Sequence, residues 1–137
     1  MQSAYQNQTV LVGRILLGLI FVLSGIGKIA GFEGTVGYVA KGGLPMPELV
    51  AALTILIELG GGLMLVFGFF TRWAAFALAV FTILAALVFH NFWTATDAMR
   101  MGQETNFLKN LSIAGGMLVL AMFGPGAFSV DAKRGMA

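Results

Sequence analysis

Glu58 is a carboxylate inside a long apolar stretch, LTILIELGGGLMLVFGFF, that holds no other charged residue and contains three consecutive glycines. An unpaired charge is costly away from water, so a carboxylate there either keeps its proton or meets a cation. In that setting it can exchange a proton with a small molecule or hydrogen-bond it. The chemistry open to Glu58 therefore depends on which basic and polar side chains the chain brings to it.

The N-terminal apolar segment offers two basic residues on one stripe. At spacings of four, three, four and three, the stripe contains Arg14, Gly18, Phe21, Gly25 and Lys28. Residues three and four apart share one face of a helix, so both basic groups should point the same way. We expect this face to turn inward and the long side chain of Arg14 to reach toward Glu58. Gly61 and Gly62 should flatten the face beside Glu58, so that another helix can approach closely.

Two later segments carry the remaining candidates. His90 is the single histidine and ends a four-residue progression from Thr82. Lys109 lies in the last apolar segment, flanked by Asn106 and Asn110. We expect Lys28, Asn106 and Lys109 at the level of His90, at the end of the bundle away from the chain termini.

Together these residues predict a polar chamber that opens at that end and has the Glu58 region as its floor. His90 and Lys109 would donate hydrogen bonds to a small molecule, and Glu58 would accept a proton. The candidate residues of the chamber are Arg14, Lys28, Glu58, His90, Asn106, Lys109 and Asn110.

Each of these residues also has a purely structural interpretation. Lys28 and Lys109 lie near expected helix ends, where they can extend to the lipid head groups. His90 can belong to an interfacial aromatic belt. Glu58 and Arg14 can form a buried pair that only stabilises the bundle.

The elements that position these residues follow from composition. The chain is 58% hydrophobic and 10% charged, and its mean hydropathy is +0.91. These values are typical of a membrane protein. Four apolar segments, at about 10–30, 48–70, 73–93 and 106–123, are near the roughly 20 residues that a membrane-spanning helix needs. Strand-like alternation is absent, so the prediction is an all-α, antiparallel four-helix bundle that forms a single domain over 1–137.

The segments that connect the apolar stretches also favour four membrane spans. FGFFTRW leaves room only for a tight turn between the second and third spans. GFEGTVGYVAKGGLPMP predicts a short interfacial helix between the first and second spans. Glu58 follows Glu48 by ten residues, so it should lie about 15 Å along its helix, near the membrane midplane. Gly-Pro-Gly after the fourth span should stop that helix, and the tail is expected to leave the membrane.

Charge and cysteine content narrow the setting. Four spans place both termini on one side, and Arg72, Lys133 and Arg134 on that side outnumber Lys41 and Arg100 on the other, which favours cytoplasmic termini. With no cysteine, thiol redox relays and thiolate metal ligands are excluded. A single histidine without clustered carboxylates predicts no metal site. The small net charge of +2 includes no basic run, so no nucleic-acid partner is expected.

Five stretches in order, RILLGLIFVLSGIGKIAGFEG, GLPMPELVAALTILIELGGGLMLVFGFFTRWAA, HNFW, NFLKNLSIAGGMLVL and GPGAFSVD, resemble the DoxX family of small bacterial inner-membrane proteins. The resemblance covers almost the whole chain. It implies a four-span bundle in the cytoplasmic membrane, with the seven chamber residues at the polar positions of the family. Relatives include the small subunit of a thiosulfate:quinone oxidoreductase and proteins of membrane oxidoreductase complexes. Members that use cysteine chemistry are no guide to this chain.

Three hypotheses of function result. In the first, the protein is a subunit or small-molecule binder, with quinone as the candidate cofactor, associated with a membrane oxidoreductase. In the second, it is a structural or assembly partner whose glycine-rich faces pack against itself or another membrane protein. The third is transport of a small solute or a proton, which requires an oligomer because four spans contain no evident repeat.

Overall fold

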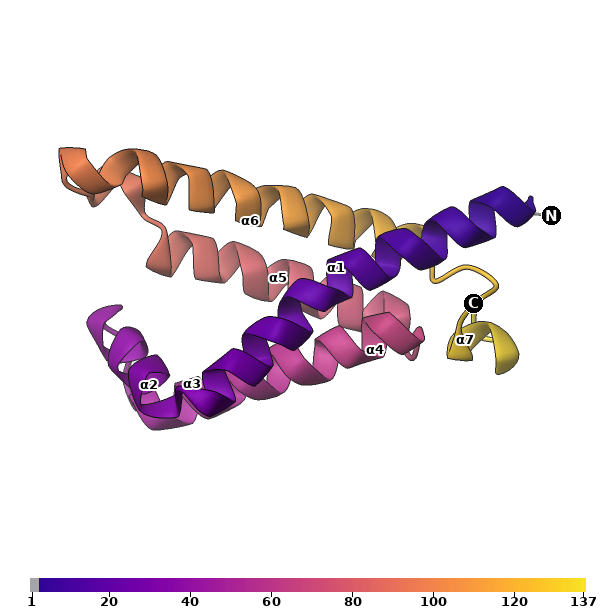
Figure 1. Ribbon diagram of the computed structural model, residues 1–137, viewed down its shortest axis with the longest axis horizontal. Helices are drawn as coiled ribbons and strands as arrows, with labels where there is room; N and C mark the ends of the chain where they lie inside the picture. The colour runs from indigo at the N-terminus through magenta and orange to yellow at the C-terminus, as the bar shows by residue number, and fades with distance from the viewer. Residues whose placement is uncertain (1–2) are drawn as a thin grey trace.

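The structure is a computed structural model that describes residues 3–137, and within that range it is built from helices and contains no strand. Four helical spans are long and apolar enough to cross a membrane (Figure 1). They are α1 (Ala4–Ala30), the second span made of α3 (Pro47–Ile55), a π-helical segment (Leu56–Gly60) and α4 (Gly61–Phe67), then α5 (Thr71–Phe89) and α6 (Asp97–Phe123). The predicted all-α bundle of four spans is confirmed.

Two helices extend beyond the predicted apolar segments. α1 begins six residues before the predicted start, where Ser3 and Gln6 form a reciprocal capping box. α6 begins at Asp97, nine residues before the predicted start at 106. Its first turns contain Asp97, Arg100 and Glu104, which have ordinary helix propensities but no hydrophobic signal. Hydropathy therefore found the apolar part of the helix and missed its polar beginning.

The second span is a continuous helix with one wide turn. Pro47 occupies its first turn, where a missing backbone N–H costs nothing. The π-helical segment Leu56–Gly60 contains Glu58 in its middle. Such π turns are rare and are frequently found at functional sites. The apolar sequence of the second span did not predict this π turn.

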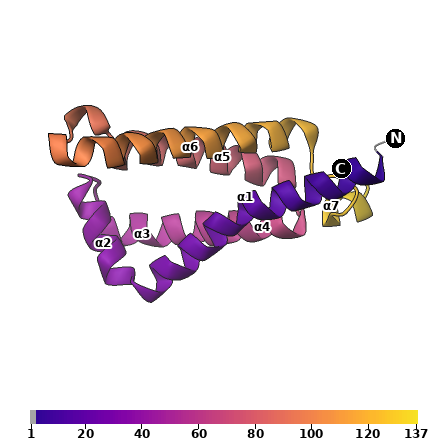
Figure 2. The same ribbon diagram turned by 45° about the horizontal axis from the view of Figure 1, so that its top comes forward.

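The helices form two pairs that meet near the chain termini and separate toward the other end (Figure 2). α1 packs along the second span, and α5 packs along α6. Glycine allows the first contact, because a Cβ added at Gly62 would lie 2.9 Å from the backbone nitrogen of Val22. The two pairs share a core of Phe21, Leu65, Leu78 and Met117. The end at which the pairs separate is called the wide end below.

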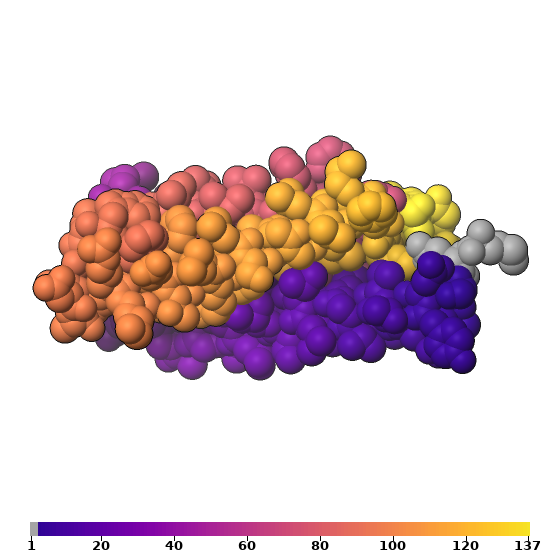
Figure 3. Space-filling view, turned by 90° about the horizontal axis from the view of Figure 1, so that it is seen from above, coloured from indigo at the N-terminus to yellow at the C-terminus, as the bar shows by residue number. Residues whose placement is uncertain are grey.

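Short helices close both ends of the bundle. α2 (Phe32–Lys41) lies at the wide end, where the Tyr38 ring stacks on Phe89 with centroids 4.9 Å apart. Burial raises the pKa of the Tyr38 phenol. α7 (Val130–Lys133) lies at the opposite end, beside the beginning of α1, so both ends of the chain lie at one end of the bundle (Figures 1 and 3). The placement of α2 at a membrane interface stays a prediction.

Candidate functional site

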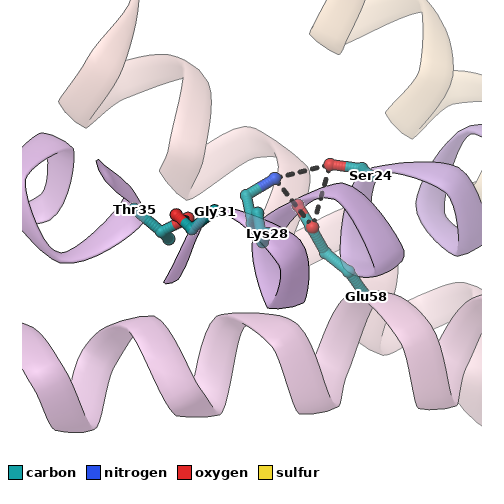
Figure 4. Close-up of polar contacts among 5 residues, drawn as sticks. All are labelled: Ser24, Lys28, Gly31, Thr35 and Glu58. Carbon is teal, nitrogen blue, oxygen red and sulfur yellow. Dashed lines mark hydrogen bonds and ion pairs between the residues drawn. The ribbon is translucent and has the colours of Figure 1, made fainter. Parts of the chain in front are cut away.

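A polar cluster of Ser24, Lys28 and Glu58 joins α1 to the π-helical segment (Figure 4). Lys28 Nζ lies 2.9 Å from Glu58 Oε2. The same ammonium donates to Ser24 Oγ at 2.5 Å, and Ser24 Oγ donates to Glu58 Oε2 at 3.0 Å. Glu58 is buried, whereas the Lys28 side chain keeps 29% of its surface exposed. The carboxylate is thus held by two donors, one of which reaches the edge of the bundle.

Local sequence explains why these three groups meet. Ser24 and Lys28 are four residues apart and therefore neighbours on one face of α1. Gly25 lies against Leu59, and a Cβ at Gly25 would come within 2.9 Å of the Leu59 Cβ and 3.0 Å of its backbone nitrogen. The absence of a side chain at Gly25 lets α1 approach the π turn that carries Glu58.

Arg14 does not pair with Glu58, and that prediction is wrong. Arg14 Nη1 donates to the carbonyl of Pro125 at 2.7 Å, and Nη2 donates to that of Phe128 at 2.7 Å and to that of Val66 at 3.4 Å. The inward direction of its stripe was predicted correctly, since Arg14 is 2% exposed. Its height was not: Arg14 precedes Ser24 by ten residues, or about 15 Å of helix. Lys28, in place of Arg14, is the basic partner of Glu58.

A cavity of about 500 Å³ lies between the two helix pairs. Five of the seven candidate residues line it: Lys28, Glu58, His90, Lys109 and Asn110. Arg14 and Asn106 do not. The cavity lining outside the candidate set also includes four serine and threonine hydroxyls, those of Ser24, Thr35, Thr54 and Thr82. A hydroxyl on an apolar helix gives a weak signal, because it is common and uncharged.

Lys109 lies deeper in the bundle than His90, so the prediction of a common level is wrong. His90 Nδ1 is 2.9 Å from Gln103 Oε1. Lys109 follows Gln103 by six residues and therefore lies about 9 Å further along α6. The early start of α6 causes the difference. Lys109 Nζ donates to Asn106 Oδ1 at 3.1 Å, and no carboxylate within residues 3–137 forms an ion pair with it.

The walls of the cavity are mostly apolar and continue onto the outer surface. Ile20 and Leu84 both line the cavity and are 43% and 56% exposed. At the wide end, where an opening was expected, α2 lies across the cavity, with Tyr38 and Val39 among its lining residues. A molecule dissolved in the lipid could therefore enter the cavity laterally, along apolar side chains. The described residues hold no group of three or more His, Asp and Glu side chains that could bind a metal ion.

A second polar cluster lies at the terminal end of the bundle, and the sequence analysis did not predict it. Asp131 accepts hydrogen bonds from the backbone nitrogens of Phe70 and Thr71 and from Thr71 Oγ1, each at 2.8 Å. Burial alone would raise the pKa of Asp131, but these bonds and the charge of Arg134 outweigh it and leave the pKa below its usual value. The tail caps the start of α5 through these bonds, and its departure from the membrane stays a prediction. Arg14 and Asp131 are called the terminal cluster below.

Comparison with known proteins gives consistent relatives. A family model described as DoxX matches residues 9–91. The inner membrane protein YqjF of Escherichia coli (strain K12) is 46% identical over 89% of this chain and 88% of its own length. The inner membrane protein YphA of the same organism is 42% identical over 90% of this chain and 88% of its own. The protein named "Putative oxidoreductase CatD" of Bacillus subtilis (strain 168) is 32% identical over 64% and 63% of the two chains. No solved structure matches significantly.

Proposed function

The chain belongs to the DoxX family, and from that premise we propose a multi-pass protein of the bacterial inner membrane that binds a quinone-type ligand in its cavity. The ligand would connect the protein with a membrane oxidoreductase, as a subunit or as a small-molecule binder. Two relatives of this chain are named as inner membrane proteins, and the name of a third is "Putative oxidoreductase CatD". The cytoplasmic location of the termini remains part of this proposal.

One observation carries the proposal: a hydrogen-bonded Lys28–Ser24–Glu58 cluster faces a cavity with mostly apolar walls, which include the exposed side chains of Ile20 and Leu84. Ligand sites combine an apolar lining with a few polar groups that fix orientation. A quinone has the same two parts, a ring with carbonyl oxygens and an apolar chain. A water-soluble metabolite would gain little from these walls.

The residues of the cavity have distinct roles in this proposal. Lys28 and Lys109 are ammonium donors for a ligand oxygen, and His90 is a further donor or acceptor through the ring nitrogen that Gln103 does not occupy. Glu58 would take up a proton from a ligand hydroxyl, while Ser24 bonds both Glu58 and Lys28. The redox chemistry belongs to the quinone itself. Arg14 and Asn106 lie outside the cavity, so Arg14 supports the fold and Asn106 positions Lys109.

Ligand binding by the purified full-length protein tests the proposal. Gentle extraction from native membrane followed by lipid analysis should recover bound quinone, and a decyl-substituted benzoquinone should bind the emptied protein. Glu58→Gln and Lys28→Met should each weaken that binding at least about tenfold, because each removes a charged hydrogen-bond partner. Glu104→Gln, an exposed carboxylate outside the cavity, is the matched control. A wild-type protein that neither retains nor binds a quinone would refute the proposal.

A structural or assembly role is the second candidate, and one observation favours it. A Cβ added at Gly13, Gly27 or Gly115 would meet nothing within 4 Å, so these glycines leave flat positions on the outside of α1 and α6. Such positions allow close packing of another helix in a membrane. Crosslinking in intact membranes separates the candidates. A stoichiometric partner that survives Glu58→Gln and His90→Ala would favour packing over ligand chemistry.

A further inference from the structure

Thr82 carries a buried hydroxyl that the fold leaves without a partner. The residue is 4% exposed, and its Oγ1 has no hydrogen-bond partner among residues 3–137. Thr82 also lines the cavity, from α5. A buried polar group without a partner loses its hydration and gains nothing in return, and such groups are uncommon in native proteins. The proposed roles of the cavity residues do not use Thr82.

The register of the helices places Thr82 at the depth of Glu58. A Cβ at Gly61 would lie 3.1 Å from the Leu78 side chain, so these two residues face each other across the antiparallel α4 and α5. Glu58 lies one turn before Gly61, and Thr82 lies one turn after Leu78. Because the helices run in opposite directions, both steps lead to the same level. The hydroxyl and the carboxylate therefore lie at one depth of the cavity.

Lys109 reaches that depth as well. A Cβ at Gly116 would lie 3.2 Å from the Leu17 side chain, which fixes the register of α6 against α1. Lys109 lies two turns before Gly116, and Ser24 lies two turns after Leu17. The cavity thus has polar groups on two opposite walls at one level. One wall is formed by α1 and the π-helical segment, and the other by α5 and α6 (Figure 2).

We propose that Thr82 is a specificity-determining residue, whose hydroxyl donates a hydrogen bond to one oxygen of the ligand while the Ser24–Lys28–Glu58 cluster bonds an oxygen on the opposite edge. This inference rests on the proposed function and narrows the ligand to a flat ring with oxygens on opposite edges, as in a para-quinone. An amphiphile that carries oxygens at one end alone can hydrogen-bond the polar groups of one wall but not those of the other. Because Thr82 Oγ1 is buried in the structure, the proposal includes a rotation about the Cα–Cβ bond on binding, and threonine populates two χ1 rotamers in helices.

Thr82→Val tests the inference, with Thr82→Ser as the matched control that keeps the hydroxyl. Binding of a decyl-substituted benzoquinone and of dodecanoate, which has oxygens at one end only, is measured on the full-length protein by calorimetry. Thr82→Val should weaken quinone binding about tenfold, as expected for one lost hydrogen bond. It should leave dodecanoate binding and the thermal midpoint unchanged or higher, because an unpaired buried hydroxyl is removed. Thr82→Ser should bind the quinone as the wild type does.

The outcomes separate this inference from the proposed function. If Thr82→Val binds the quinone as tightly as the wild type while Glu58→Gln binds it weakly, the Thr82 contact is wrong and the quinone site stands. If Thr82→Val weakens both probes equally, the opposite-edge arrangement is wrong. If the wild type binds no quinone, the proposed function fails and this inference fails with it.

Discussion

The terminal cluster and the group of Ser24, Lys28 and Glu58, called the cavity cluster below, both contain buried charged side chains, but these side chains have different kinds of hydrogen-bond partner. Arg14 and Asp131 bond mainly to backbone groups: Arg14 to carbonyls of the tail and Asp131 to the first amides of α5. Lys28 and Glu58 bond to side chains, and the space beside them is a cavity. Backbone groups cannot move without changing the fold, whereas side chains can exchange one partner for another.

This difference separates residues that hold the structure from residues that can bind something. Breaking a contact of the terminal cluster leaves buried backbone groups without a hydrogen-bond partner, which lowers the free energy of unfolding. Breaking the Lys28–Glu58 pair leaves the ammonium of a side chain that is 29% exposed and that can still donate to Ser24. Substitutions at the terminal end should therefore lower stability, and substitutions at the cavity should lower ligand binding.

Arg14→Met is expected to have the largest effect on stability. It leaves the carbonyls of Pro125 and Phe128 without their donor, and each buried acceptor without a partner costs about 1–3 kcal/mol. We expect a loss of about 3 kcal/mol in the free energy of unfolding, measured by reversible denaturation in mixed micelles. The folded fraction should bind the quinone probe normally. Arg72→Met is the control, since Arg72 also bonds carbonyls but at an exposed position. Equal losses in both variants would contradict the role given to burial.

The two clusters also differ in how far they could be predicted. Hydropathy predicted the four spans, and the three-and-four spacing predicted which face of α1 turns inward. Spacing gives the direction of a side chain but not its height relative to another helix, so it could not show that Lys28, and not the predicted Arg14, pairs with Glu58. The contact of Gly25 with Leu59 sets that height.

Contacts of the tail could not be predicted for a related reason. Asp131 follows Gly-Pro-Gly by several residues, and nothing local shows that the chain turns back to the start of α5. The depth of Lys109 was missed because polar turns at the start of α6 give no hydropathy signal. The unpaired Thr82 hydroxyl could only be recognised once its neighbours were placed.

Gly25→Ala should connect the two regions by disturbing both stability and binding. The added methyl group would lie 2.9 Å from Leu59 Cβ and must push α1 away from the π turn. Overpacking of this kind costs about 2 kcal/mol, and separation of Lys28 from Glu58 should weaken quinone binding. Gly27→Ala is the matched control on the same helix, because its methyl group meets nothing within 4 Å. A Gly25→Ala protein as stable as Gly27→Ala would show that this contact does not set the height of α1.

Asp131→Asn should have a smaller effect that depends on pH. The pKa of Asp131 is lowered in the folded protein, so its carboxylate stabilises the fold above the ordinary value of 3.8. That contribution is lost as the pH falls below 3.8 through the lower folded value. At neutral pH the loss on substitution should be about 1 kcal/mol, because the amide has one acceptor oxygen in place of two and loses at least one of the three hydrogen bonds. Unfolding measured from pH 7 to pH 3 should show a weaker pH dependence for Asp131→Asn. An unchanged pH profile would assign the acid sensitivity to another carboxylate.

Glu58→Gln should have the smallest effect on stability and thereby gives the sharpest contrast between the clusters. The amide keeps the size of the carboxylate, and its oxygen can still accept from Ser24 and Lys28. Only the ion pair is lost while both hydrogen bonds can remain, so the cost should be about 0.6 kcal/mol, as for an average hydrogen-bonded contact between membrane helices. Unfolding of Glu58→Gln beside the Glu104→Gln control measures it. A loss as large as that of Arg14→Met would mean that the pair holds the bundle together, which would favour the assembly role over ligand binding.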